Sequence, residues 1–149
     1  MGIVSAMGVA NKGEPKVMDC LINATEMAAN RDATYEVELK KLEDKHVTTA
    51  QALLTDKAEY DAYIAAFNEE LNDLRAMFKA IYIAGCSTEA FGDFVVGHGE
   101  LWTARLCAAT IRCKGGKAVW IDARDILVVT EAEDGGVDVN HNLSNANLD

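Results

Sequence analysis

The sequence predicts an α/β domain with a mainly parallel sheet and a helical hairpin. Short apolar runs that are typical of buried strands alternate with longer segments whose apolar residues recur at helical spacing, as in layered α/β domains. The run GIVSAM at 2–7 is the first expected strand, because β-branched residues lead into small residues and a turn. AVWI at 118–121 and the apolar run at 126–129 are expected strands near the other end.

Two long helices are expected between these strands, after a loop at 11–15 and a shorter helix at 16–29. Their apolar residues recur at alternating spacings of three and four, which is a heptad-like pattern. Thr55 and Asp56 connect them, so we expect an antiparallel hairpin whose seams pack on each other or on the sheet. Gly85 is the expected stop of the second helix. The first seam comprises Tyr35, Leu39, Leu42, His46, Thr49 and Leu53, and the second comprises Tyr60, Ile64, Phe67, Leu71, Leu74, Phe78 and Ile81.

Two further helices are expected in the second half of the chain. A short one covers 87–94, and another begins at Gly97 and runs to about Lys114. Two adjacent apolar rows on the latter predict that it is largely buried. The acidic tail from Glu131 to Asp149 is rich in Gly and Asn and is an expected surface loop.

Composition excludes several classes of function. The chain has 149 residues, a length typical of one domain, with 14 basic and 24 acidic residues and a net charge of −10. This charge argues against binding to nucleic acid or to an anionic membrane surface. No apolar segment reaches the roughly 18 residues of a membrane span, and the N-terminus lacks the pattern of a signal peptide.

Cysteine and histidine spacing argues against a structural zinc site and a disulfide framework. No pair of cysteines has CxxC spacing, and the histidines do not cluster with them, so a reducing compartment is favoured. His46 lies on a helical seam, where a packing role is favoured over a ligand role because metal sites need several converging donors. The cysteines are Cys20, Cys86, Cys107 and Cys113, and the histidines are His46, His98 and His141.

Three segments place polar residues where open α/β sheets bind ligands, beyond the carboxyl ends of strands or at a helix start. They are 5–8, 97–100 and 122–125. No dinucleotide-binding glycine motif, Walker-type loop, HExxH motif or nucleophile elbow is present. Residues alone therefore predict only a cleft for a small ligand.

Each candidate residue has two interpretations. Glu100 either stabilises the first turn of a helix or holds a cationic group of a ligand that two glycines allow to approach. Ser5 is either a ligand-binding residue or a turn residue. Arg124 is either a ligand-binding residue or a member of a surface ion pair, because it lies between two aspartates.

Four stretches carry a resemblance to a known family. They are SAMG at 5–8, LNDLRAMFKAIYIAG at 71–85, FVVGHGELWTARL at 94–106 and VWIDARDILVV at 119–129. Together they resemble aspartate kinases of the amino-acid kinase superfamily, most closely the kinase part of plant-type bifunctional aspartate kinase–homoserine dehydrogenases. The resemblance runs from about Ile3 to the C-terminus and implies a partial amino-acid-kinase fold.

The resemblance implies an activity and a substrate site. Aspartate kinases transfer the γ-phosphoryl group of ATP to the β-carboxylate of L-aspartate, in lysine, threonine and methionine biosynthesis. In the family, the residue matching Glu100 binds substrate aspartate, the serine matching Ser5 lies at the same pocket, and Arg124 also matches a family position. A carboxylate can neutralise the α-ammonium of aspartate, so the resemblance favours the ligand interpretation of Glu100.

The sequence also departs from the family pattern. The KFGGT-type strand, whose lysine meets the phosphates, and the GRGGSD-type segment with the nucleotide-binding half are not in this chain. The family threonine that follows SAM is replaced by Ala10 or Met18, and NKGEP resembles an insertion. We therefore expect residues 1–149 to form a partial aspartate kinase domain, without assigned catalytic residues, that is inactive when isolated. The alternative is a non-catalytic interaction module, or a vestigial fragment, with a helical hairpin.

Cofactors and partners are expected from the resemblance alone. ATP and Mg²⁺ are bound mainly by segments outside this chain, and NADP is expected only if a homoserine dehydrogenase half follows. L-aspartate is the expected small-molecule partner, and the complete protein is an expected homo-oligomer. The plastid stroma is the expected location, with the cytoplasm as the alternative. No cofactor-binding or metal-binding residue is assigned within the chain.

Overall fold

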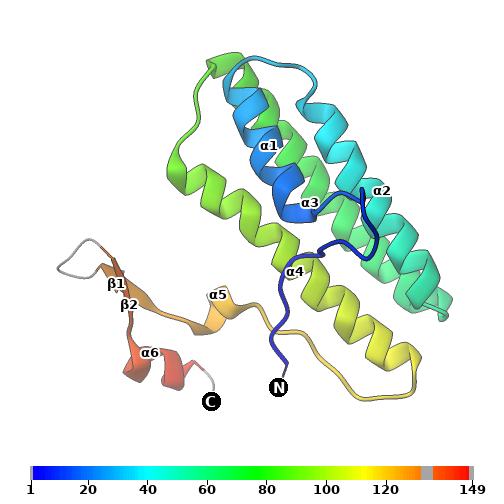
Figure 1. Cartoon of the computed structure of the whole chain (residues 1–149). Helices are drawn as coiled ribbons and strands as arrows, with labels where there is room; N and C mark the ends of the chain where they lie inside the picture. Colours follow the sequence, from blue (N-terminus) through cyan, green and yellow to red (C-terminus); the bar gives the residue numbers. More distant parts are fainter. Residues whose placement is uncertain (1, 132–135, 148–149) are drawn as a thin grey trace. The chain divides into compact units, whose positions relative to one another are not determined.

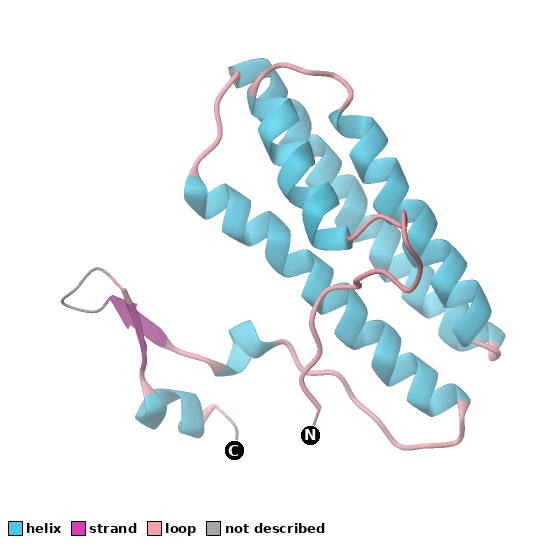
Figure 2. Ribbon diagram, viewed as in Figure 1, coloured by secondary structure: helices cyan, strands magenta, loops and turns pink. Residues whose placement is uncertain are grey.

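A computed structural model describes residues 2–131 and 136–147, and the chain divides into two units, Met1–Ala118 and Val119–Asp149. Most described residues lie in helices (Figure 2). The first unit contains α1 (Val17–Ala29), α2 (Tyr35–Leu53), α3 (Lys57–Ala84) and α4 (Glu89–Cys113). The second contains α5 (Ala123–Ile126), β1 (Val129–Glu131), β2 (Val137–Val139) and α6 (His141–Ala146).

The first unit is a bundle in which α1 contacts each of the other three helices and α3 contacts both α2 and α4 (Figure 1). The expected hairpin is confirmed. The side chain of Asp56 caps α3 by accepting a hydrogen bond from the backbone N–H of Glu59, at 3.0 Å. The same helix ends at Gly85, whose φ of 74° is the left-handed conformation that glycine adopts most readily.

The core of the bundle follows the central part of the expected seams and departs from them towards one end. On α3 the central seam residues Phe67, Leu71, Leu74 and Phe78 are fully or almost fully buried. On α2 the seam is buried up to His46 and then continues through Ala50 and Leu54 in place of Thr49 and Leu53. A straight helix has 3.6 residues per turn, so its buried face drifts away from a 3.5-residue repeat.

The expected parallel sheet is not found in the described part of the chain. Residues 2–7 and 118–121 adopt no strand, and the two described strands, β1 and β2, pair antiparallel with Val129 opposite Val139. The predicted strand at 126–129 is instead divided between the end of α5 and the start of β1. An apolar run becomes a strand only when a neighbouring strand accepts and donates its backbone hydrogen bonds, and 2–7 has no such neighbour among the described residues.

The tail is more structured than expected. Residues 137–139 form β2, and the side chain of Asn140 caps α6 by accepting a hydrogen bond from the backbone N–H of Leu143 at 3.1 Å. Asn and Asp favour helix N-caps as well as loops, so composition alone did not separate the two. Part of the predicted loop, 132–135 and 148–149, lies outside the described residues.

The two helices expected at 87–94 and from Gly97 are one continuous helix, α4. It begins at Glu89, where Thr88 accepts a hydrogen bond from the backbone N–H of Phe91 at 3.2 Å. Gly97 and Gly99 therefore lie inside a helix, where each costs up to about 1 kcal/mol relative to alanine. Trp102, Leu106 and Ala109, on one of the two expected apolar rows, are buried as expected, whereas Ile111 on the other row is 47% exposed.

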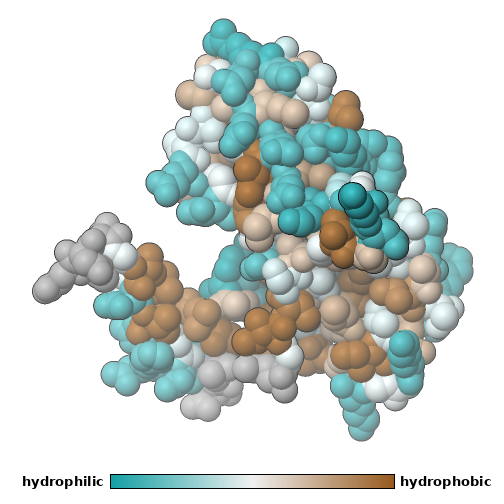
Figure 3. Space-filling view, in the orientation of Figure 1, coloured by the Kyte–Doolittle hydropathy of each residue, from teal (hydrophilic) through white to brown (hydrophobic). Residues whose placement is uncertain are grey.

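Several large apolar side chains are exposed, and apolar areas interrupt the hydrophilic surface (Figure 3). In the first unit, Ile3 is 91% exposed, in the segment that was expected to form a strand. Ile83, near the end of α3, is 67% exposed. Exposed apolar residues that gather in patches are typical of surfaces that contact another segment or protein.

Candidate functional site

The N-terminal segment meets α4 at Gly99, and this contact defines the candidate site. A Cβ added to Gly99 would lie 3.0 Å from the Cβ of Ala6 and 3.1 Å from a methyl carbon of Val17 on α1. Glycine at this position therefore allows both segments to approach the helix closely. Ser5 directly precedes Ala6 and Glu100 directly follows Gly99, so the contact brings these two exposed residues to the same part of the unit.

Glu100 lies well inside α4, so the interpretation as a first-turn residue is wrong. The free backbone N–H groups of this helix are at its start near Glu89, where Thr88 provides the cap. The carboxylate of Glu100 is exposed and forms no hydrogen bond or ion pair with another residue of the described ranges. It is therefore available to a cation from solvent.

Another carboxylate of the bundle, that of Glu70, is already engaged. Glu70 on α3 accepts hydrogen bonds from Nε1 of Trp102 at 2.7 Å and from the Arg105 guanidinium at 2.8 and 3.1 Å. Partial burial raises the pKa of Glu70, but Arg105 and Trp102 lower it by more, so the carboxylate stays ionised. Its role is to join α3 to α4.

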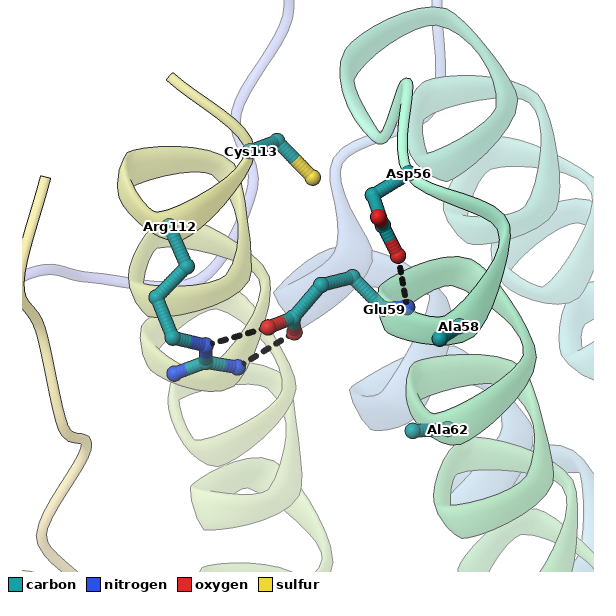
Figure 4. A pocket seen from close by; sticks show the side chains of 6 residues that line it. All are labelled: Asp56, Ala58, Glu59, Ala62, Arg112 and Cys113. Atoms are coloured by element: carbon teal, nitrogen blue, oxygen red, sulfur yellow. Dashed lines mark hydrogen bonds and ion pairs between the residues drawn. The ribbon is translucent and has the colours of Figure 1, made fainter. Parts of the chain in front are cut away.

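A shallow pocket of about 340 Å³ lies between the start of α3 and the end of α4 (Figure 4). Its two main charged groups face each other: both oxygens of Glu59 accept hydrogen bonds from Arg112, each at 2.7 Å. Arg112 lowers the pKa of Glu59 through these hydrogen bonds. The Arg112 guanidinium also donates to the carbonyl of Ala118 at 3.0 Å. The charges of Glu59 and Arg112 are therefore already paired with each other and are not free to bind a ligand in this pocket.

Arg124 lies in the second unit, on α5, and is paired with Asp122. Its Nη2 donates to Oδ2 of Asp122 at 2.6 Å and its Nε donates to both oxygens, at 3.0 and 3.1 Å. The ion-pair interpretation therefore describes this residue in the structure. Its proposed contact with substrate stays a prediction from the resemblance.

His46 is a core residue, and its hydrogen-bonding partner, Tyr63, was not predicted from the sequence. Its ring is fully buried and stacks on Phe67 at 4.8 Å, and its Nδ1 lies 2.8 Å from the hydroxyl of Tyr63. Burial, with a smaller effect from Lys45, lowers the pKa of His46 to about 3. Tyr63 lies one turn before Phe67 on α3, so its helical spacing from the predicted seam was the available signal.

Neither a metal-binding cluster nor a membrane-spanning helix is found among the described residues. No three or more His, Cys, Asp or Glu side chains there come together in a group able to hold a metal ion. No described helix is both long and apolar enough to cross a membrane.

The chain is similar to plant proteins that carry two enzyme names. It is 44% identical over 136 residues to "Bifunctional aspartokinase/homoserine dehydrogenase 1, chloroplastic" of Arabidopsis thaliana, covering 91% of this chain and 14% of the relative. It is 41% identical over 136 residues to "Bifunctional aspartokinase/homoserine dehydrogenase 2, chloroplastic" of Zea mays, again covering 91% of this chain and 14% of the relative. An aspartokinase of Schizosaccharomyces pombe is more distant, at 31% identity over 109 residues, 72% of this chain and 21% of that protein.

No family model matches the chain, and no solved structure gives a significant match. The chain spans 14% of the length of the first two relatives, so these similarities concern one segment of much longer proteins. The aligned region covers 91% of this chain for both of these plant relatives. The chain is thus a homologue of one segment of the plant bifunctional aspartokinase/homoserine dehydrogenases, with aspartokinases as more distant relatives.

Proposed function

We propose that the chain is part of an aspartate kinase domain and contributes the surface that binds L-aspartate. Glu100 pairs with the α-ammonium of the substrate, and the hydroxyl of Ser5 donates a hydrogen bond to one of its carboxylates. Arg124 enters the proposal as a substrate-binding residue through the resemblance alone. The observation that carries the proposal is the exposed, unpaired carboxylate of Glu100 beside the close contact between Ala6 and Gly99.

The proposed role of Glu100 has a physical reason. A charge-assisted hydrogen bond to an ammonium group fixes one end of aspartate and leaves the β-carboxylate free to attack the γ-phosphorus of ATP. The attacking carboxylate oxygen forms a bond to phosphorus while the bond to the β-phosphate oxygen breaks, which releases ADP. Phosphoryl transfer needs positive charge around the phosphates, and we assign the binding of ATP and Mg²⁺ to segments outside this chain.

The wider setting of the domain is proposed from the names of the relatives. We place the chain in the aspartate-derived pathway to lysine, threonine and methionine, in the plastid stroma, with the cytoplasm as the alternative location. A homo-oligomeric complete protein and an NADP-dependent homoserine dehydrogenase half belong to the same proposal.

A second candidate function is a non-catalytic interaction module. The family threonine is replaced here by Ala10, in the exposed loop before α1, or by Met18 within that helix. Neither alanine nor methionine supplies the hydroxyl, and exposed apolar residues such as Ile83 offer a contact surface. In that case the site at Glu100 would be vestigial.

Ligand titration of the chain followed by ¹H–¹⁵N NMR separates these functions. L-aspartate should shift the amide signals of 5–8 and 98–102, whereas succinate, which has both carboxylates but no ammonium, should bind more weakly. In the Glu100→Gln variant the preference for aspartate over succinate should disappear. Glu69→Gln is the control: it removes another exposed carboxylate, on α3, and the preference for aspartate over succinate should remain. Equal binding of both ligands by the unchanged chain would favour the interaction module.

A further inference from the structure

Lys45 links α2 to the loop that follows the candidate site. Its Nζ donates hydrogen bonds to the carbonyl oxygens of Gly8 and of Pro15, the latter at 2.8 Å, and lies 3.7 Å from a carboxylate oxygen of Glu14. The side chain of Lys45 is only 13% exposed, whereas that of Lys40 on the same helix is 60% exposed. Lys45 is therefore a largely buried cation whose polar contacts, with residues 8, 14 and 15, all lie in one loop.

The loop at 8–15 has no helix or strand of its own, and its polar groups converge on the partners of Lys45. The two carboxylate oxygens of Glu14 accept hydrogen bonds from the side chain of Asn11 at 2.6 Å and from the backbone N–H of Ala10 at 3.0 Å. Both hydrogen bonds lower the pKa of Glu14, and the hydrogen bond from Asn11 has the larger effect. The polar contacts of this loop thus centre on the carboxylate of Glu14 and the ammonium group of Lys45.

The same loop is joined to the segment that carries Ser5. The backbone N–H of Val17, at the start of α1, donates to the carbonyl of Met7 at 3.0 Å, and Ala6 lies against Gly99. Lys45 binds the next carbonyl along the chain, that of Gly8. Two consecutive carbonyls directly after the Ser5–Ala6 pair are therefore fixed from two different helices.

We propose that Lys45 is a positioning residue for the aspartate site, in that it holds residues 5–8 against α4 so that Ser5 stays in the same part of the unit as Glu100. The inference rests on the proposed aspartate site. Lys45 does not touch the substrate. An ammonium group suits this role because it is a compact charge with several donors, which can serve carbonyls in different directions.

The test compares three variants of the same 149-residue chain. Lys45→Met keeps the apolar stem and removes the charge, and Lys45→Arg restores the charge with a different shape. Lys40→Met is the matched control, because it removes an exposed lysine of the same helix whose ion-pair partners among the described residues, Glu43 and Asp44, both lie on α2. Amide hydrogen exchange at Ala10 and Val17 reports on the loop, and titration with L-aspartate reports on the site.

In Lys45→Met, exchange at Ala10 and Val17 should accelerate about tenfold or more, whereas exchange in the centre of α3 should stay unchanged. The affinity for L-aspartate should fall about tenfold, because the loss of charge-assisted hydrogen bonds leaves Ser5 poorly placed. Lys45→Arg should recover most of the affinity, and Lys40→Met should behave as the unchanged chain. A purely structural role would not make aspartate affinity follow the charge at this position.

The two proposals fail in different ways. If the unchanged chain binds aspartate no better than succinate, the proposed aspartate site is wrong and the positioning role falls with it. If the unchanged chain prefers aspartate and Lys45→Met binds it equally well, only the role of Lys45 is wrong. Faster loop exchange without loss of affinity would also overturn that role.

Discussion

The Cβ of Ala6 would lie only 3.0 Å from a Cβ added to Gly99, so the N-terminal segment rests directly on the backbone of α4. Gly97, one half-turn earlier in the same helix, has open space at the corresponding place, with no atom within 4 Å. Two glycines of one motif therefore have different roles. Only Gly99 is required by the packing of 5–8 and α1.

Alanine substitution of each glycine should separate these roles. Gly97→Ala should stabilise the unit by about 0.5–1 kcal/mol, because alanine is the better helix former. Gly99→Ala gains the same helix propensity but crowds Ala6 and Val17, and overpacking costs about 1–3 kcal/mol, so a net loss of about 1 kcal/mol is expected. Urea unfolding of both variants measures the difference, and equal stabilisation by both would show that the contact is looser than described.

Acid should destabilise the first unit through His46 before most carboxylates titrate. The pKa of His46 falls from 6.5 to about 3 on folding, so below pH 6.5 the unfolded chain binds a proton that the folded chain does not. Stability should therefore fall by up to about 1.4 kcal/mol per pH unit as the pH drops below 6.5 towards 3. Glu59, Glu70 and other carboxylates with lowered pKa values add to the loss only at lower pH.

Urea unfolding of the unchanged chain and of His46→Gln between pH 6.5 and about 5 isolates this effect. Glutamine keeps a polar side chain near Tyr63 but does not titrate in this range. The variant is expected to be less stable at pH 7 and to lose less stability on acidification. Parallel pH profiles for the two proteins would show that His46 is not the group that titrates.

The helical hairpin was predictable because the signals that specify it lie within the helices and at their ends. Apolar spacing set the buried faces of α2 and α3, and Asp56 and Gly85 marked a start and a stop that the structure reproduces. The continuity of α4 was not predictable in this way. Two glycines are normally a break signal, and only the contact of Ala6 with Gly99 shows why one of them is tolerated within a helix.

The predictions of strands at 2–7 and 118–121 were wrong for a different reason. Residues 2–7 and 118–121 have strand-like composition, but a strand depends on hydrogen bonds to a neighbour that local sequence does not specify. Within the candidate site, Glu100 and Ser5 were identified through motifs, whereas Lys45 was missed. In the core, the pairing of Tyr63 with His46 was missed as well. The importance of Lys45 and Tyr63 comes from contacts with residues far away in the sequence, Gly8 and His46 respectively.

The isolated chain should show no aspartate-dependent consumption of ATP. The resemblance places the phosphate-binding lysine and the nucleotide-binding half outside this chain, and phosphoryl transfer depends on such groups. A coupled assay of ADP release, with and without L-aspartate, measures this. Aspartate-dependent ADP release from the pure chain would contradict the assignment of ATP binding to other segments.

Glu100→Gln, in a protein that also contains the phosphate-binding and nucleotide-binding segments, tests the role of Glu100 most directly. The substitution keeps the shape and removes the charge, so a contact worth roughly 1.5–3 kcal/mol with the α-ammonium is lost. Steady-state kinetics should show a roughly ten- to hundred-fold fall in kcat/KM for aspartate, with the KM for ATP nearly unchanged. A thermal melt of the variant should stay close to that of the unchanged protein, because Glu100 has no partner within the described ranges. Unaltered kcat and KM for aspartate would contradict the proposal that Glu100 binds the substrate.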